Sequence, residues 1–431
     1  MALRFGTDGV RGEALTELTP QFVTSLGRAA SNVLASDRWI VGRDTRASGA
    51  QLAAAFGAGI DAEVVDLGVL PTPAVAFWSQ RLSVPAAVVT ASHNPWTDNG
   101  VKIFAAGGLK LTDEVEATIE AELEADGEVT PRERSTPMAD AHTGYIDHVV
   151  AELPRLDGLK VVLDCANGAM SRVAGAAFER LGAEVEVIFD TPDGTNINEG
   201  CGATAPGALG AAVVERTADL GLAFDGDGDR VIAVDHLGKV VDGDHLLALA
   251  AMQLRDQGRL SDDTVVVTVM SNLGFHRAME AAAIRVVTTP VGDRSVLEAL
   301  DANGWSLGGE QSGHIIYRSL ATTGDGLLAG LRLAADVHTR QQPLADLAAA
   351  AMTSYPQVLL NVRVADRHPQ VADELAAEIS IAEAALAGEG RVLVRASGTE
   401  PLIRVMVEAA TSELAWQVAQ QLSDVVRSRF A

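Results

Sequence analysis

The chain has 431 residues, of which 48% are hydrophobic, 4% are aromatic and 21% are charged. This length suits about three domains of ~150 residues each, and the hydrophobic fraction excludes wholesale disorder. The formal charge of −25, from 33 basic and 58 acidic residues, argues against nucleic acid or an anionic membrane as the main partner.

The cysteine content and the apolar segments indicate the compartment. Only Cys165 and Cys201 are present, and they form neither a Cys-x-x-Cys pair nor a disulfide framework. The N-terminal stretch lacks the apolar core of a signal peptide, and no run of about 18 apolar residues occurs. We therefore expect a reduced, cytoplasmic protein that does not bind membranes.

Strand-like and helix-like segments alternate along most of the chain, which favours βαβ units. The first group contains predicted strands at 39–41, 62–67 and 86–89 and a helix at 50–60. The polar stretch 124–141 is predicted to be a linker. The second group contains strands at 159–165, 184–189 and 220–224 and a helix at 174–181; the third contains helices at 245–254 and 275–283 and strands at 264–270 and 285–289.

The end of the chain follows a different pattern. Strands are predicted at 358–364, 391–395 and 402–408, and an amphipathic helix at 412–429, after a joint at Tyr355 and Pro356. The predicted domains are 1–140, 141–240, 241–355 and 356–431. The sequence thus predicts an α/β protein with three tandem mixed-sheet domains of similar topology and a smaller C-terminal α+β domain, arranged around a central cleft.

A serine is presented at the end of a predicted buried strand. Ser92 follows the strand at 86–89, and Asn94 and Pro95 then end regular structure. Open α/β sheets keep their chemistry at the carboxyl ends of strands. Most loop serines only bind water or cap the backbone. The evidence for a functional role of Ser92 therefore depends on a second, acidic loop.

The acidic loop alternates aspartate with glycine directly after the strand at 220–224. Glycine allows a tight backbone, so Asp225, Asp227 and Asp229 can converge on one hard cation. An EF-hand calcium loop is excluded, because Arg230 and His236 occupy the positions that require glycine and a bidentate glutamate. The alternative is a solvated acidic turn. The predicted cation is Mg²⁺, because few protein carboxylates leave room for water and a phosphoryl oxygen.

Two further loops carry polar groups after strands. The loop at 395–401 combines arginine, hydroxyl groups and glycine, which suits a phosphate cradle but also an ordinary Ser-Gly turn. The loop at 308–314 combines a carboxylate, an amide, a hydroxyl and an imidazole, which suits a sugar. A polar turn with a surface histidine is the alternative for this loop.

Four such loops in this order resemble the α-D-phosphohexomutase superfamily, over a match from Phe5 to Arg404. Within it, the stretches 5–12 and 291–294 and Gln311 are similar to the bacterial phosphoglucosamine mutases. The resemblance implies an isomerase that interconverts glucosamine 6-phosphate and glucosamine 1-phosphate. The reaction would pass through a phosphoserine enzyme and a glucosamine 1,6-bisphosphate, and would supply UDP-N-acetylglucosamine and cell-wall synthesis.

The resemblance also implies residue roles. Ser92 would carry the phosphoryl group and, with Asp225, Asp227 and Asp229, hold Mg²⁺. Lys102, a candidate general base, and His93 would transfer protons. Arg11 and Arg230 would steady the phosphoryl group. The sugar would be held by Glu310, Ser312 and His314, and the non-reacting phosphate by Arg395, Ser397, Gly398, Thr399 and Arg404.

The implied partners are small. They are a phosphosugar substrate and, as activator, glucosamine 1,6-bisphosphate or another hexose bisphosphate, bound by a monomer or homodimer. Two alternatives stay open: a phosphoglucomutase or phosphomannomutase of the same superfamily, and a catalytically silent phosphosugar-binding protein. Ser92, the three aspartates and Lys102 argue against the second, because a binding protein does not need all of them.

Overall fold

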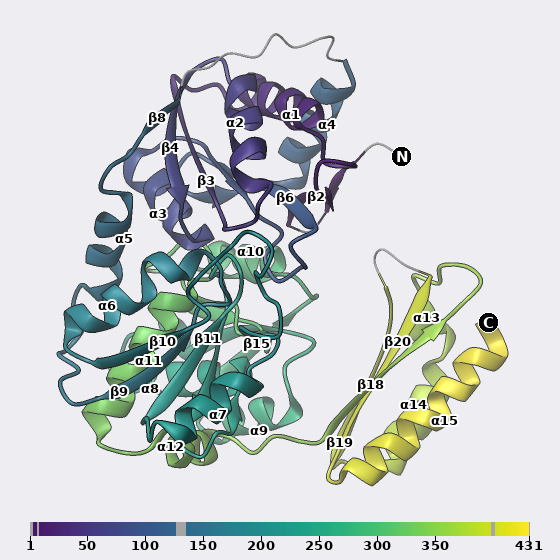
Figure 1. Ribbon diagram of the computed structural model, residues 1–431. Coiled ribbons are helices and arrows are strands. Elements are labelled where there is room, and N and C mark those ends of the chain that lie inside the picture. Colours follow the sequence, from purple (N-terminus) through teal and green to yellow (C-terminus); the bar gives the residue numbers. More distant parts are fainter. Residues whose placement is uncertain (1–2, 7, 126–134, 398–400, 431) are drawn as a thin grey trace. The chain divides into compact units, whose positions relative to one another are not determined.

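The computed structural model describes residues 3–6, 8–125, 135–397 and 401–430 (Figure 1). The chain divides into two compact units, one formed by residues 1–270 and 284–350 and the other by residues 271–283 and 351–431. Within the described ranges, no helix combines the length and the apolar character needed to cross a membrane.

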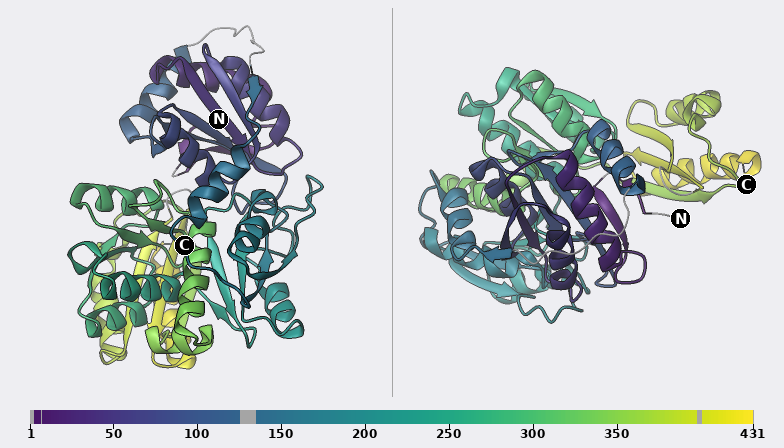
Figure 2. Two further views of the ribbon diagram at one scale, coloured as in Figure 1. Left: turned by 90° about the vertical axis from the view of Figure 1, so that its left-hand side faces the viewer. Right: turned by 90° about the horizontal axis from the view of Figure 1, so that it is seen from above.

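The first domain of the larger unit is built on an eight-stranded mixed sheet in the order β1-β2-β6-β5-β3-β4-β8, with β7 paired to β6. Helices cover both faces: α1, α2 and α4 pack on one side and α3 on the other (Figure 2). Trp39 and Phe56 are fully buried between the sheet and α2. The strands are β1 (Phe5–Gly6), β2 (Gly9–Glu13), β3 (Arg38–Arg43), β4 (Glu63–Val69), β5 (Ala86–Val89), β6 (Asp98–Ala105), β7 (Leu109–Lys110) and β8 (Ser135–Pro137). The helices are α1 (Pro20–Val33), α2 (Gly49–Gly59), α3 (Thr72–Leu82) and α4 (Asp113–Ala125).

The second domain carries a five-stranded sheet in the order β10-β9-β11-β12-β13. Its central strands β11 and β12 are buried along their whole length, as expected of a strand covered on both faces. The strands are β9 (Lys160–Asp164), β10 (Glu184–Ile188), β11 (Leu220–Phe224), β12 (Val231–Asp235) and β13 (Val240–Val241). The helices are α5 (Ala141–Val150), α6 (Ala174–Leu181), α7 (Gly207–Glu215) and a short 3-10 turn at Ala169–Arg172.

The third domain has a four-stranded sheet in the order β15-β14-β16-β17. Its long helices begin at aspartate caps: Asp242 accepts a hydrogen bond from the backbone of α8, and Asp325 does the same for α11. The strands are β14 (Thr264–Thr268), β15 (Arg285–Thr289), β16 (Leu307–Gly309) and β17 (Ile315–Tyr317). The helices are α8 (Gly243–Asp256), α10 (Asp293–Asn303), α11 (Gly326–Arg340), α12 (Leu344–Ala351) and a 3-10 turn at Ser261–Asp263.

The smaller unit is an antiparallel sheet in the order β18-β20-β19, on which α15 packs through Val418, Leu422 and Val426. The buried Glu408 accepts hydrogen bonds from the first backbone N–H of α9 (2.9 Å) and from Arg391 (3.1 Å). These bonds tie α9 to the sheet. The elements are α9 (Leu273–Ala281), β18 (Gln357–Arg363), α13 (Val371–Glu374), α14 (Ala376–Ala385), β19 (Gly390–Ala396), β20 (Leu402–Ala409) and α15 (Ser412–Phe430).

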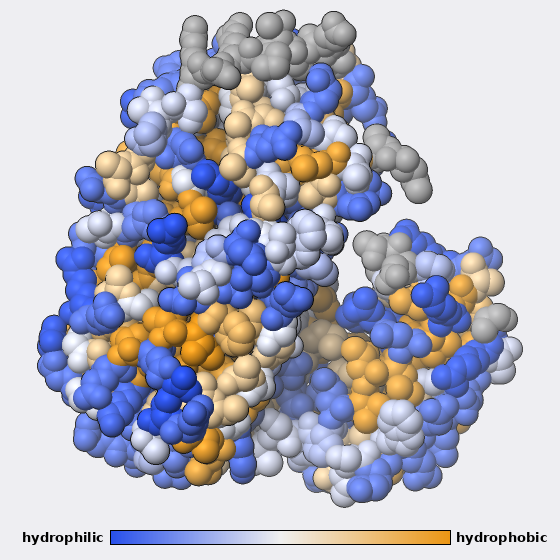
Figure 3. Space-filling view, viewed as in Figure 1, coloured by the Kyte–Doolittle hydropathy of each residue, from blue (hydrophilic) through white to orange (hydrophobic). Residues whose placement is uncertain are grey.

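The three larger sheets share one arrangement, in which a pair of parallel strands is continued by an antiparallel strand. Strands β3 and β5 are followed by β6, β9 and β11 by β12, and β14 and β16 by β17. The α/β fold class predicted from the sequence, with three mixed sheets of similar topology and a smaller C-terminal α+β part, is confirmed; the central cleft stays a prediction. Figure 3 shows hydrophilic residues over much of this face, with hydrophobic residues gathered in several patches between them.

One sequence prediction differs from the structure. The stretch 124–141 is not only a linker, because β8 lies within it and pairs in parallel with β4. In the division into two compact units, the segment 271–283 groups with the C-terminal unit, and the units meet at residues 350 and 351. The four-domain division of the chain stays a prediction.

Candidate active site

Three of the loops singled out from the sequence are the same connection in three sheets. Ser92 lies between β5 and β6, the acidic loop lies between β11 and β12, and Glu310 and His314 lie between β16 and β17. Each loop follows the carboxyl end of a parallel strand, which is where α/β sheets bind ligands. All three loops belong to the larger unit.

Ser92 is buried, 1% exposed, and its backbone adopts a φ of 52°. A serine in this left-handed region costs free energy, so the surrounding structure must hold it there. Its hydroxyl donates a 2.6 Å hydrogen bond to Asp225 Oδ2, and its N–H donates to Thr90 Oγ1 at 2.9 Å. The turn therefore aims the hydroxyl at the acidic loop.

A buried arginine stabilises this turn through hydrogen bonds to its backbone. The guanidinium of Arg46 is completely enclosed and pairs with Asp44 at 2.8 Å. It donates to the backbone carbonyls of Ser92 (2.9 Å), Asn94 (2.8 Å), Asp98 (3.0 Å) and Pro95. Asn198, from the second domain, adds a 2.9 Å bond to the Ser92 carbonyl. A second bond from Asn198, to the Asn94 carbonyl at 3.1 Å, brings to six the donor contacts from Arg46 and Asn198 to the backbone around Ser92.

The three aspartates are buried and converge as predicted. One oxygen of each lies within 4.8 Å of one oxygen of the others. Two glycines make this approach possible: a Cβ on Gly226 would lie 2.6 Å from the Ser92 carbonyl, and Gly228 has a φ of +73°. The Asp-Gly alternation therefore lets the acidic loop and the Ser92 loop touch through their backbones.

Lys102 neutralises part of this charge. Its ammonium lies 2.8 Å from Asp227 Oδ2, 3.0 Å from Asp229 Oδ2 and 2.8 Å from Asp8 Oδ2. Burial alone would lower the pKa of Lys102, but the three carboxylates hold it well above its ordinary value. While these partners surround it, Lys102 is an ammonium at pH 7; its role as a general base, suggested from the sequence, stays a prediction.

The unshared oxygens of the acidic loop fit a divalent cation. Asp227 Oδ1 and Asp229 Oδ1 are buried, and neither accepts a hydrogen bond from the residues that the structure describes. Burial and the charges of Asp229 and Asp227 also raise the pKa of Asp225 well above its ordinary range. A buried acceptor without a partner costs about 1–3 kcal/mol, and hard cations such as Mg²⁺ prefer oxygen ligands. The donor set therefore suits a metal.

His93 and Arg230 flank the serine. His93 Nδ1 lies 3.3 Å from Ser92 Oγ and 3.2 Å from Arg230 Nη1. Burial, together with the nearby cations Arg230 and Arg11, lowers the pKa of His93 to about 4. The imidazole is therefore neutral at pH 7 and can accept a proton. Arg11 reaches the same region and pairs with Asp8 at 2.6 Å.

The third loop brings His314 to the acidic loop. His314 is buried, with Nδ1 3.6 Å from Asp229 Oδ1, and its Nε2 accepts a 3.1 Å bond from the Gly324 N–H. Glu310 accepts a bond from the Gly292 N–H at 3.3 Å. Ser312 is exposed on the surface of this loop. Only part of the predicted sugar-binding group therefore lies against the aspartates.

The C-terminal unit carries an arginine pair of its own. Arg395 and Arg404 stand directly opposite each other on β19 and β20, where like charges repel. Burial and the neighbouring Arg404 lower the pKa of Arg395. Ser397 is buried beside them, whereas Gly398 and Thr399 lie outside the described residues. Adjacent guanidinium groups of this kind suit an anion such as phosphate.

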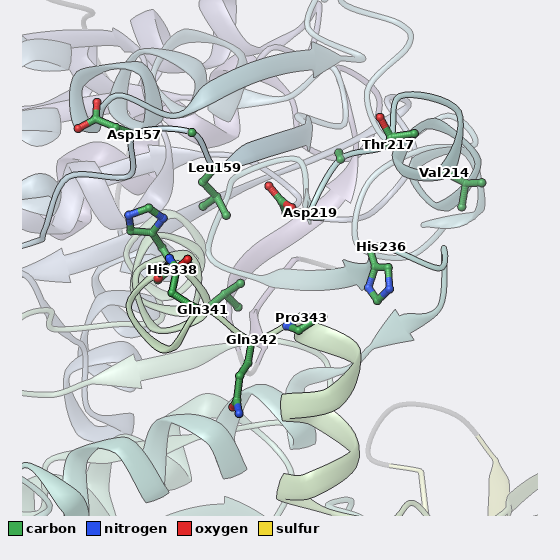
Figure 4. A pocket seen from close by; sticks show the side chains of 13 residues that line it. Asp157, Leu159, Val214, Thr217, Asp219, His236, His338, Gln341, Gln342 and Pro343 are labelled. Atoms are coloured by element: carbon green, nitrogen blue, oxygen red, sulfur yellow. Dashed lines mark hydrogen bonds between the residues drawn. The ribbon is translucent and has the colours of Figure 1, made fainter.

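A cavity of about 580 Å³ lies elsewhere in the larger unit (Figure 4). It is lined by Leu159 and Asp219, which immediately precede β9 and β11, and by His338 near the end of α11. This is the amino end of the parallel strands, opposite the end that carries Asp225. The cavity is therefore separate from the candidate active site.

The chain matches all four domains of one protein family. The phosphoglucomutase/phosphomannomutase α/β/α domains I, II and III match residues 2–130, 143–238 and 242–355, and the C-terminal domain of that family matches residues 359–425. The chain belongs to this family. Its acidic loop and Ser92 lie in domains II and I of the family, respectively.

Curated relatives agree with this membership, and solved structures share the fold. Phosphoglucosamine mutases of Rhodococcus opacus (strain B4) and Thermobifida fusca (strain YX) are 51% and 52% identical, over at least 99% of each chain. A family protein from Burkholderia thailandensis has a TM-score of 0.81 at 24% identity, covering 98% of this chain and 97% of that chain. The N-acetylphosphoglucosamine mutase of Aspergillus fumigatus, solved with GlcNAc-6P and magnesium, has a TM-score of 0.69 at 19% identity, covering 99% and 96%.

Several residues of this family member were not found from the sequence. Asp8 joins Arg11 and Lys102, Thr72 donates a 2.6 Å bond to Asp227, and Asn198 and Arg46 hold the Ser92 turn. Their place in the sequence is the one signal that could have found two of them. Arg46 closely follows the predicted strand at 39–41, and Asp8 lies within the stretch 5–12.

Proposed function

We propose that this chain is a phosphoglucosamine mutase that interconverts glucosamine 6-phosphate and glucosamine 1-phosphate. The full-length identity of about half to curated phosphoglucosamine mutases supports the substrate. The observation that carries the chemistry is the Ser92 hydroxyl, buried and 2.6 Å from Asp225 in a cluster of three carboxylates. Phosphoryl transfer needs such positioning and charge neutralisation more than covalent chemistry.

The proposed reaction moves one phosphoryl group from Ser92 Oγ to a sugar hydroxyl. The bond between phosphorus and Oγ breaks and a bond to the sugar oxygen forms; neutral His93 accepts the sugar hydroxyl proton, and the Lys102 ammonium donates a proton to the leaving Ser92 oxygen. In the second half, the other phosphate returns to Ser92, whose hydroxyl proton goes back to Lys102, and His93 returns its proton to the sugar oxygen that the phosphate leaves. Mg²⁺ bound by Asp225, Asp227, Asp229 and the Ser92 oxygen would supply Lewis-acid neutralisation of phosphoryl charge. Arg11 and Arg230 would steady the same group.

A substrate panel tests this proposal. Purified protein with a catalytic amount of a hexose 1,6-bisphosphate should convert glucosamine 6-phosphate with the highest kcat/KM, followed by glucose 6-phosphate and mannose 6-phosphate. A clear preference for glucose or mannose phosphate would identify a phosphoglucomutase or phosphomannomutase. Binding of these phosphosugars without turnover of any would identify a silent binding protein.

Removing the metal should abolish turnover. Excess chelator should stop the reaction and added Mg²⁺ should restore it, because the buried carboxylates repel one another without a cation. Asp227→Asn should raise the Mg²⁺ concentration needed for half-maximal activity by at least about tenfold. Asp219→Asn, at the other end of the same sheet, is the matched control. Full activity in chelator, or an unchanged Mg²⁺ requirement in Asp227→Asn, would contradict the metal site.

Arg395→Ala should raise KM strongly and leave kcat nearly unchanged. Losing a bidentate charged contact to phosphate costs about 1.5–3 kcal/mol, or about 10- to 150-fold in binding. Steady-state kinetics on glucosamine 6-phosphate provide the measurement. Arg363→Ala, which removes an exposed arginine from the same sheet, is the control. An unchanged KM in Arg395→Ala would exclude Arg395 from phosphate binding.

A further inference from the structure

Two consecutive residues at the start of α10 join the third domain to the first. Asp293 forms an ion pair with Lys110 of β7. Arg294 pairs with Glu116 of α4 at 2.5 Å and also with Asp113. The pair of opposite charges on α10 thus meets a complementary pair on the first domain, and both bridges cross the same junction within the larger unit.

Only one of the two bridges continues toward the acidic loop. The Lys110 ammonium lies 3.1 Å from Asp8 Oδ1, and Asp8 Oδ2 lies 2.8 Å from the Lys102 ammonium. Lys102 in turn contacts Asp227 and Asp229. Groups of alternating charge therefore run from Asp293 through Lys110 and Asp8 to Lys102. The ion pairs of Arg294 are with Glu116 and Asp113 of α4 and do not include Asp8 or Lys102, although Glu116 lies near enough to Lys110 for their charges to interact.

Asp293 does more than stabilise its own helix. A carboxylate in the first turn of a helix is favoured by the helix dipole, but no side chain caps α10 with a hydrogen bond. The Asp293 carboxylate instead faces Lys110 and lies 3.5 Å from Nε2 of His314. Its side chain is 13% exposed, and that of Lys110 is 14% exposed. The pair is thus placed beside the site and shielded from water.

Because these ion pairs are shielded from water, the charge state and position of each of the four residues depend on the others. Burial alone would lower the pKa of Lys110, but Asp293 and Asp8 hold it above its ordinary value. Burial alone would raise the pKa of Asp8, but Lys102 and Lys110 hold it below its ordinary value. Removing one partner of a buried ion pair leaves an uncompensated charge, and its neighbours must move to satisfy it. Loss of Lys110 would therefore shift the Asp8 carboxylate and, with it, the Lys102 ammonium that Asp8 contacts.

Building on the proposed function, we propose that Lys110 and Asp293 are positioning residues of the phosphoryl transfer. They hold the first domain against the third and, through Asp8, fix the place of the Lys102 ammonium beside the acidic loop. The structure places neither among the contacts of the Ser92 hydroxyl. Their effect on the reaction passes through Lys102.

Kinetics of four variants test this inference. Lys110→Met and Asp293→Asn should each lower kcat by about 10- to 100-fold, because small misplacements of a catalytic group have effects of this size. KM should stay within about twofold, since the loss is confined to the transition state. The double variant should lower kcat by no more than the larger of the two single losses, because both residues act through the same series of ion pairs. Lys110→Arg keeps the charge and should recover most of kcat.

Arg294→Met is the matched control, because it cuts the second bridge across the same junction without touching Asp8 or Lys102. Its kcat should stay within about twofold of wild type. Thermal unfolding and circular dichroism check that each variant is folded; if Lys110→Met does not fold, Asp293→Asn and Lys110→Arg carry the comparison. Wild-type kcat in the Lys110 and Asp293 variants, an equal loss in Arg294→Met, or a loss that appears in KM would overturn the inference. An inactive wild-type protein would instead refute the proposed function.

Discussion

Ser92→Ala is expected to remove turnover while leaving the protein folded and the three aspartates of the metal site in place. The substitution deletes the only hydroxyl that the structure directs at Asp225 from the β5–β6 loop, so no acceptor for the phosphoryl group remains. We expect kcat to fall by at least about 10³-fold, since loss of a nucleophile is not replaced by positioning alone. A coupled mutase assay measures this loss, and phosphopeptide mapping of the wild-type protein should place the phosphate on Ser92.

Ser83→Ala provides the matched control for this experiment. Ser83 also has a left-handed backbone, with a φ of 56°, but it ends α3 on the protein surface. Alanine in that conformation tests the stability cost of the substitution without the chemistry. Near wild-type turnover in Ser92→Ala, or phosphate mapped to another residue of the active protein, would end the proposed mechanism.

The parts of the site that could be predicted from the sequence are those whose signal is local. Ser92 and the three aspartates each follow a short buried strand, and the alternating glycines of the acidic loop identify the tight turn. The β5–β6, β11–β12 and β16–β17 connections repeat one arrangement, so a prediction of βαβ alternation also places these loops at corresponding sheet ends.

The remaining residues depend on contacts across long stretches of sequence. An arginine after a strand has the same local pattern whether it points to water or, like Arg46, beneath a loop near residue 92. Lys110 and Asp293 meet only because two domains pack together. The strand β8 has three residues and no apolar alternation to reveal it. The attachment of α9 requires Glu408, which lies far along the chain on β20.

Arg46→Met is expected to have the largest effect on stability among the variants considered. Methionine fills much of the same volume but leaves Asp44 buried without its ion-pair partner and removes one donor from each of four backbone carbonyls. Breaking a buried ion pair from one side costs about 3–5 kcal/mol. The free energy of unfolding in urea should fall by that amount, and hydrogen exchange of residues 90–98 should accelerate. Turnover should fall as well, because the strained φ of Ser92 depends on these bonds.

Two comparisons separate the role of the arginine fork from that of its charge. Arg38→Met removes a half-exposed arginine of β3 that pairs with Glu63 on the surface, and should cost about 0–1 kcal/mol. Arg46→Lys keeps the cation near Asp44 but cannot reach four carbonyls at once, because an ammonium has three donors and no planar fork. It should therefore recover stability more fully than turnover. Equal recovery of both would show that charge alone holds the turn, and wild-type exchange rates in Arg46→Met would show that the loop keeps its shape without this side chain.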